Sequence, residues 1–207
     1  MRALKRDAPF LKDVYGLVAE KQHRKQDIFT KKRKTDFVYV LKRLKVVAAG
    51  SDTDAKADRM WEKLFELALF VRSDGVHRKA PDILRKFINA PDAKEEAALT
   101  KQERSRLQNA FDFLTRAYKQ STLGNTRLAS EYSHFYIMIT ALLKSDLRNI
   151  GDGELTRKLV SLGSKMDTNE DPESDIGKYL ALSSKQTTDA EKRKDRQMLF
   201  VSIVKGL

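Results

Sequence analysis

The segment that most constrains the fold is Tyr132–Leu143. It reads Tyr-Ser-His-Phe-Tyr-Ile-Met-Ile-Thr-Ala-Leu-Leu. On a helical wheel its apolar side chains cover nearly every side, so a helix of this kind must be surrounded by protein or by lipid. The segment is too short to cross a bilayer, which takes about 20 apolar residues. It therefore predicts the central helix of a globular, all-helical core.

The remainder of the chain also predicts an all-α fold. Its 207 residues include only 9 glycines and 4 prolines, which favours long helices over many short strands and tight turns. Apolar residues recur at helical spacing, and no segment shows the convincing alternation of a half-buried strand. Besides the central helix, helices are expected over residues 9–21, 36–49, 55–71, 81–88, 100–120, 154–165, 176–182 and 188–205.

These segments predict an orthogonal multi-helix bundle of about seven to nine helices around residues 132–143. The length suits one large domain, so we expect residues 1–207 to form a single all-helical domain. A linker that contains Pro91 would subdivide this domain into a basic N-terminal part, residues 1–90, and a C-terminal part, residues 100–207.

Three local patterns predict where particular elements begin or end. Thr100–Glu103 and Thr188–Glu191 both read as capping boxes, in which a hydroxyl accepts from the third helical amide while the Glu reaches back to the cap. Each is expected to start a helix. Residues 167–175 hold five acids and no base around Pro172, which predicts an exposed loop.

The net charge of +12 favours partners with a negative surface, nucleic acid first and acidic proteins or anionic lipid second. Most of the excess lies between Lys21 and Lys45, where ten bases stand against two acids. The alternative interpretation of such a run is a solvated loop whose charge only keeps the protein soluble.

The basic run precedes the helix expected from Asp36, so basic side chains and free helical amides would meet a phosphate together. No base-reading motif accompanies the run, and we expect contacts mostly to the nucleic-acid backbone. The main residues expected to contact phosphates are Lys31, Lys32, Arg33 and Lys34, and the secondary ones are Arg24, Lys25, Lys42 and Arg43.

A second candidate site lies where the central helix begins. Arg127 and His134 are separated by six residues, a pattern that resembles the motif of the all-helical HEPN ribonucleases. The resemblance implies a dimeric, metal-independent ribonuclease in which His134 is the general acid or base and Arg127 steadies the phosphorane. The alternative is a hydrogen-bonded histidine in a packed helix.

Several other kinds of site are excluded or disfavoured. The absence of cysteine removes disulfides, thiolate catalysis and cysteine-based metal sites. Glu131 and His134 form a Glu-x-x-His pair, but a di-iron site needs a second copy. Pro81-Asp82 with Asp92-Ala-Lys94 mimics a metal-dependent nuclease, but that site needs strands. We therefore expect no metal or cofactor.

The N-terminus lacks a signal-peptide apolar region, so we expect a cytoplasmic protein without membrane attachment.

Six segments, mostly helical patterns rather than catalytic motifs, resemble one family in their order along the chain. They are Met1-Arg-Ala-Leu4, Arg59–Phe70, Ile83–Ile88, Phe111–Leu114, Phe135–Leu143 and Thr187–Arg196. Together they resemble the helical C-terminal region of GmrSD-type restriction proteins, which are phage-defence proteins with a ParB-like N-terminal domain.

The resemblance implies a role without catalysis, because this sequence lacks the catalytic parts of the family. It contains neither the family's Asp-Gly-Gln-Gln-Arg-type motif, linked to nucleotide hydrolysis and DNA cleavage, nor a C-terminal HNH nuclease. The implied role is a separated module without catalytic residues that serves as scaffold, contacts DNA more than RNA, or regulates a catalytic protein partner or a missing N-terminal catalytic domain. A structural protein–protein interaction domain remains the further alternative.

Overall fold

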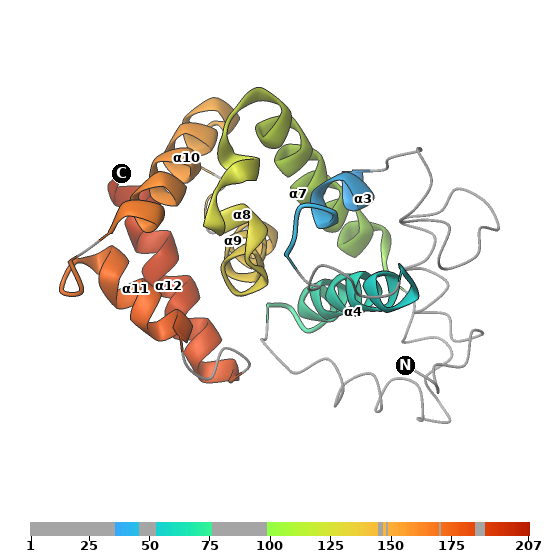
Figure 1. The fold of residues 1–207 in the computed structure, drawn as a ribbon. Helices are drawn as coiled ribbons and strands as arrows, with labels where there is room; N and C mark the ends of the chain where they lie inside the picture. The colour runs from blue at the N-terminus through green and yellow to red at the C-terminus, as the bar shows by residue number, and fades with distance from the viewer. Residues whose placement is uncertain are drawn as a thin grey trace.

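The structure is a computed structural model that describes residues 36–45, 53–75, 99–144, 147, 149–169, 171–184 and 189–207. Within these ranges the fold is all-α and contains no strand, as the sequence predicts (Figure 1). The expected helices at residues 9–21 and 81–88 lie outside the described residues, as does the linker at Pro91. The α-helices are α3 (Asp36–Leu41), α4 (Thr53–Arg72), α7 (Lys101–Gln120), α8 (Arg127–Ser130), α9 (Tyr132–Lys144), α10 (Asp152–Thr168), α11 (Asp175–Ser184) and α12 (Ala190–Gly206), and Leu123–Asn125 forms the 3₁₀-helix η1.

Helix α9 is the centre of the bundle, which confirms the prediction for the apolar segment. Every side chain of α9 before Lys144 is at least partly buried, and Phe135, Ile137 and Ile139 are fully buried. The helix lies between α4 and α7 on one side and α10 to α12 on the other (Figure 1). Protein therefore surrounds its apolar sides, as the helical wheel requires. None of the helices in the described ranges is long and apolar enough to span a membrane.

The helix expected over residues 36–49 is shorter than predicted, because α3 ends at Leu41. The chain then makes a tight turn. In this turn Arg43 N–H donates to Val40 O at 3.1 Å and Leu44 N–H donates to Leu41 O at 3.2 Å. The amide of Lys45 then donates to the carbonyl of Ser130 at 2.7 Å. A contact with a segment 85 positions away in the chain replaces the helical bond, and periodicity alone does not reveal such a contact.

The capping box at the start of α7 is confirmed. Thr100 Oγ1 accepts from the Glu103 amide at 3.2 Å, and Glu103 Oε2 accepts from the Thr100 amide at 2.7 Å. The same carboxylate binds Arg72 Nη1 at 3.1 Å, which links the end of α4 to the start of α7.

The capping box predicted at Thr188–Glu191 is wrong, because the N-cap of α12 is Asp189. Its carboxylate accepts from the amide of Lys192 at 3.1 Å. With the cap at Asp189 the third helical residue is a lysine, which cannot return a bond to the cap amide. A carboxylate at this end also complements the positive end of the helix dipole. The acidic loop predicted at residues 167–175 is shorter than predicted, because α10 continues to Thr168 and α11 begins at Asp175. Residues 171–173 between these helices are exposed.

A break that the apolar pattern does not reveal separates α8 from α9. Glu131 adopts extended backbone angles, φ −93° and ψ 122°, between the two helices. Helix α10 packs closely against the start of α8: a Cβ on Gly163 would lie 2.7 Å from Oγ1 of Thr126, the N-cap of α8. The break allows Arg127 and His134 to approach the same side chain from two different helices.

Candidate functional site

Of the eight basic residues predicted to contact phosphates, two lie in the described part of the chain. Lys42 and Arg43 occupy the turn that follows α3, and Lys42 is exposed. The exposed Lys45 follows them in the same turn. The other six residues, Lys31, Lys32, Arg33, Lys34, Arg24 and Lys25, lie outside the described residues.

Arg43 is held by neutral groups. Its Nη2 donates to the hydroxyl of Tyr39 at 3.0 Å, and its Nη1 lies 3.5 Å from Oδ1 of Asn125 in η1. No carboxylate among the described residues pairs with it. The guanidinium therefore keeps its charge uncompensated within this part of the structure, at a partly exposed position. Such a cation is suited to binding an anion from solution.

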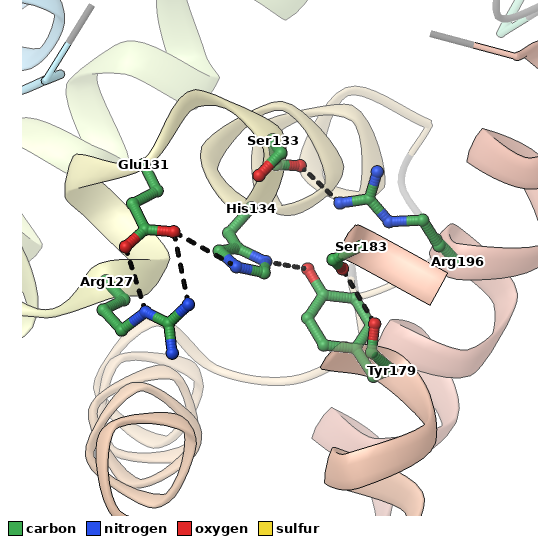
Figure 2. Close-up of polar contacts among 7 residues, drawn as sticks. All are labelled: Arg127, Glu131, Ser133, His134, Tyr179, Ser183 and Arg196. Carbon is green, nitrogen blue, oxygen red and sulfur yellow. Dashed lines mark hydrogen bonds and ion pairs between the residues drawn. The ribbon is translucent and has the colours of Figure 1, made fainter. Parts of the chain in front are cut away.

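Arg127 and His134 are brought together, but through Glu131. Arg127 Nε lies 3.0 Å from Glu131 Oε1 and its Nη2 lies 3.4 Å from Oε2 (Figure 2). His134 Nε2 lies 3.6 Å from the same Oε2. Burial opposes ionisation of Glu131, but the hydrogen bond and charge of Arg127, with help from Lys45, lower its pKa. The carboxylate is thus ionised and occupies the space between the two predicted catalytic residues.

The imidazole of His134 lies inside the protein with 2% of the residue exposed. Its Nδ1 lies 3.2 Å from the hydroxyl of Tyr179 on α11. Burial and the positive charge of Arg196 lower the pKa of His134 to about 4, against a smaller opposing effect of Glu131. The imidazole is therefore neutral at pH 7, is shielded from solvent, and is a weak base. In this arrangement it joins α9 to α11.

A polar cluster continues from Tyr179 to α12. Burial raises the pKa of Tyr179 to about 12, so its hydroxyl stays protonated. Arg196 is 1% exposed and donates from Nη2 to the carbonyl of Ser133 at 2.8 Å (Figure 2). Its guanidinium carbon lies 5.9 Å from the centre of the Tyr179 ring. Burial lowers the pKa of Arg196, as expected for a cation far from water.

A buried ion pair joins helices from distant parts of the chain. Arg193 Nη1 on α12 lies 2.6 Å from Glu66 Oε1 on α4, and both side chains are about 95% buried. The hydroxyl of Tyr132 donates to the other oxygen of Glu66 at 2.5 Å. The guanidinium carbon of Arg193 lies 4.3 Å from the centre of the Tyr136 ring. Burial alone would lower the pKa of Arg193, but Glu66 and the tyrosines raise it.

A surface depression of about 450 Å³ lies between α7 and α10, with Phe113 and Val160 among its lining residues. Two arginines, Arg116 and Arg157, line it. Arg116 is an ion-pair partner of Asp112 and lies 2.8 Å from Asp152. Two carboxylates compensate Arg116, whereas no carboxylate among the described residues pairs with the exposed Arg157. Among the described residues no three acidic or histidine side chains form a metal-binding group.

Sequence reasoning missed the partners that decide how these residues behave. In the sequence Glu131 stands out only as half of a di-iron pattern, and no motif marks Tyr179, Glu66 or Arg193. One signal was available: Arg193 and Arg196 share a helical face with Phe200, at a spacing of three and four residues. Basic residues on the buried face of a helix indicate buried partners, but the pattern does not say which.

Comparison with known proteins adds no family to this geometry. The GmrSD-type and HEPN resemblances rest on the sequence patterns alone, and both stay predictions. No protein-family model, curated protein or solved structure matches the chain.

Proposed function

We propose that this protein is a non-catalytic, basic helical module that binds nucleic acid, mostly through the phosphate backbone. It acts in the cytoplasm and supports or regulates a catalytic partner in phage-defence restriction. DNA is the preferred nucleic acid. The observation that carries the binding function is the uncompensated guanidinium of Arg43, which directly follows α3 in the most basic stretch of a chain with a net charge of +12.

The charge distribution supports binding to the backbone rather than to bases. Lys42, Arg43 and Lys45 follow α3, and the run Lys31–Lys34 precedes it in the sequence. Helix α3 has six residues, so its ends are about 9 Å apart. Cations before and after such a short helix suit several phosphates of one nucleic acid. The preference for DNA and the role of a catalytic partner rest on the resemblance to GmrSD-type proteins.

The proposal predicts that replacing Lys31, Lys32, Arg33 and Lys34 by glutamine weakens binding to all DNA sequences alike. Each lost phosphate contact removes about 0.9 from the slope of log K against log salt, so the slope should fall by about 3 to 4. The measurement is a titration of a labelled DNA duplex at several salt concentrations, with a matched RNA duplex alongside.

The matched control replaces four exposed lysines on α10, α11 and α12 by glutamine: Lys165, Lys178, Lys194 and Lys205. This variant has the same net charge and should keep most of the wild-type affinity. Equal losses in both variants would mean that only net charge matters. No binding by the wild type at low salt would remove the proposal and favour a structural protein–protein interaction domain.

The ribonuclease alternative rests on the Arg127–His134 sequence pattern, and in the structure both residues contact Glu131. A metal-independent ribonuclease at this site predicts that the wild type cleaves RNA in the presence of a chelator and that His134→Ala abolishes cleavage. Circular dichroism of the variant must match the wild type, because His134 is buried. Cleavage that persists in a folded His134→Ala variant, or no cleavage by the wild type, contradicts this alternative.

A further inference from the structure

We infer that Arg43 and Lys119 form a phosphate-binding site around the ring of Tyr39, where α3, α7 and η1 meet. The site would bind the phosphodiester backbone of a nucleic acid. This inference rests on the nucleic-acid-binding function proposed above and adds Lys119, Tyr39 and Asn125 to it. Lys119 and Asn125 lie far from the basic stretch Lys21–Lys45, and Tyr39 is an uncharged residue within it.

The ring of Tyr39 contacts two cations. The guanidinium carbon of Arg43 lies 5.3 Å from the ring centre, and Nζ of Lys119 lies 5.4 Å from it. Both distances fall within the range in which the electron-rich face of an aromatic ring attracts a cation. The two charges are therefore at most about 11 Å apart, although they repel each other. A phosphate bound beside both would relieve that repulsion.

Neutral contacts orient Arg43 before any anion binds. The Tyr39 hydroxyl and the Asn125 side chain accept from its two terminal nitrogens. The backbone of η1 allows this position, because a Cβ on Gly124 would lie only 3.1 Å from Arg43 Nη1. The ring of Tyr118 supports the guanidinium from 5.9 Å. A guanidinium has five N–H donors, so donors remain for a phosphate.

The charge balance at this site differs from that of a nearby arginine on α7. Arg116 is paired with Asp112 and Asp152. In contrast, no carboxylate among the described residues pairs with Arg43 or Lys119, and the side chains that contact them there are neutral. Two cations fixed by neutral groups bind an anion without first breaking an ion pair. The junction of α3, α7 and η1 brings two such cations to one ring, whereas the depression between α7 and α10 has one, Arg157.

The test measures binding of the full chain to a labelled DNA duplex across a salt series. Arg43→Gln and Lys119→Gln should each reduce the salt slope by about 0.9, because each removes one phosphate contact. Tyr39→Leu keeps every charge but loses the ring, so affinity should fall about fivefold while the slope stays near the wild-type value. Tyr39→Phe keeps the ring and should restore most of the affinity.

The matched control is Lys194→Gln, which changes an exposed lysine of α12. Helix α12 lies across the bundle from α3 (Figure 1). It should leave affinity and slope nearly unchanged. Normal binding in Arg43→Gln, Lys119→Gln and Tyr39→Leu, together with loss of binding in the Lys31–Lys34 variant, would overturn this site and leave the proposed function intact. No binding by the wild type would overturn both.

The contacts of Arg43 and Lys119 that suit a backbone phosphate also suit a free phosphate ion. Inorganic phosphate is therefore added to the DNA complex and compared with chloride at the same ionic strength. A backbone site predicts equal displacement by the two salts, because separate phosphate ions lack the linked charges of a strand. Displacement by phosphate alone, lost in Arg43→Gln, would assign the site to a free phosphate instead and overturn the backbone assignment.

Discussion

Replacing Glu66 by alanine should lower the free energy of unfolding by about 3–5 kcal/mol, because it leaves the buried guanidinium of Arg193 without its carboxylate. Glu66 also accepts the hydrogen bond of Tyr132, so two polar groups lose one partner at once. The affected residues come from α4, α9 and α12, and the loss should therefore destabilise the whole bundle. Urea denaturation followed by circular dichroism measures the change.

Two controls separate charge burial from the general effect of a truncation. Glu154→Ala removes an exposed carboxylate from the i,i+4 pair with Lys158 and should cost less than about 1 kcal/mol. Replacing Glu66 and Arg193 together by methionine should recover much of the stability, because an apolar pair carries no buried charge. A Glu66→Ala variant as stable as Glu154→Ala would contradict the buried ion pair.

The stability of the protein should fall by about 3 kcal/mol between pH 6.5 and pH 4 through His134 alone. Its pKa is about 4 in the folded protein and near the ordinary value of 6.5 in the unfolded chain. The unfolded chain therefore takes up the proton first as the pH falls, which favours unfolding. The contribution is fully present above pH 6.5 and is lost as the pH approaches 4.

Carboxylates also titrate in this range, so the measurement compares two proteins. The free energy of unfolding of the wild type and of His134→Gln is measured from about pH 7.5 to about pH 4, a range that runs from above the unfolded-state pKa of His134 down to its folded-state pKa. Glutamine does not titrate, and the difference between the two proteins should shrink toward low pH. A constant difference across the range would show that His134 titrates equally in the folded and unfolded states.

The elements that the sequence predicted well are those whose cause is local. The capping box at Thr100 forms because its two hydrogen bonds join residues three apart. Helix α9 is central because its apolar side chains cover nearly every side, whatever the order of its neighbours. The helix after Asp36 was predicted too long because a bond between Lys45 and Ser130 ends its tight turn.

The candidate sites also combine properties that the sequence sets locally with contacts that only tertiary packing makes. Composition and spacing determined that the protein is all-helical, strongly basic and built around residues 132–143, because charge and periodicity are properties of the chain itself. Only the tertiary structure decided that Glu131 separates Arg127 from His134, that Arg43 shares the ring of Tyr39 with Lys119, and that Glu66 meets Arg193. The last pair is 127 positions apart in the chain. Partners so distant are chosen by how helices pack, and packing depends on shape and buried charge across the whole core.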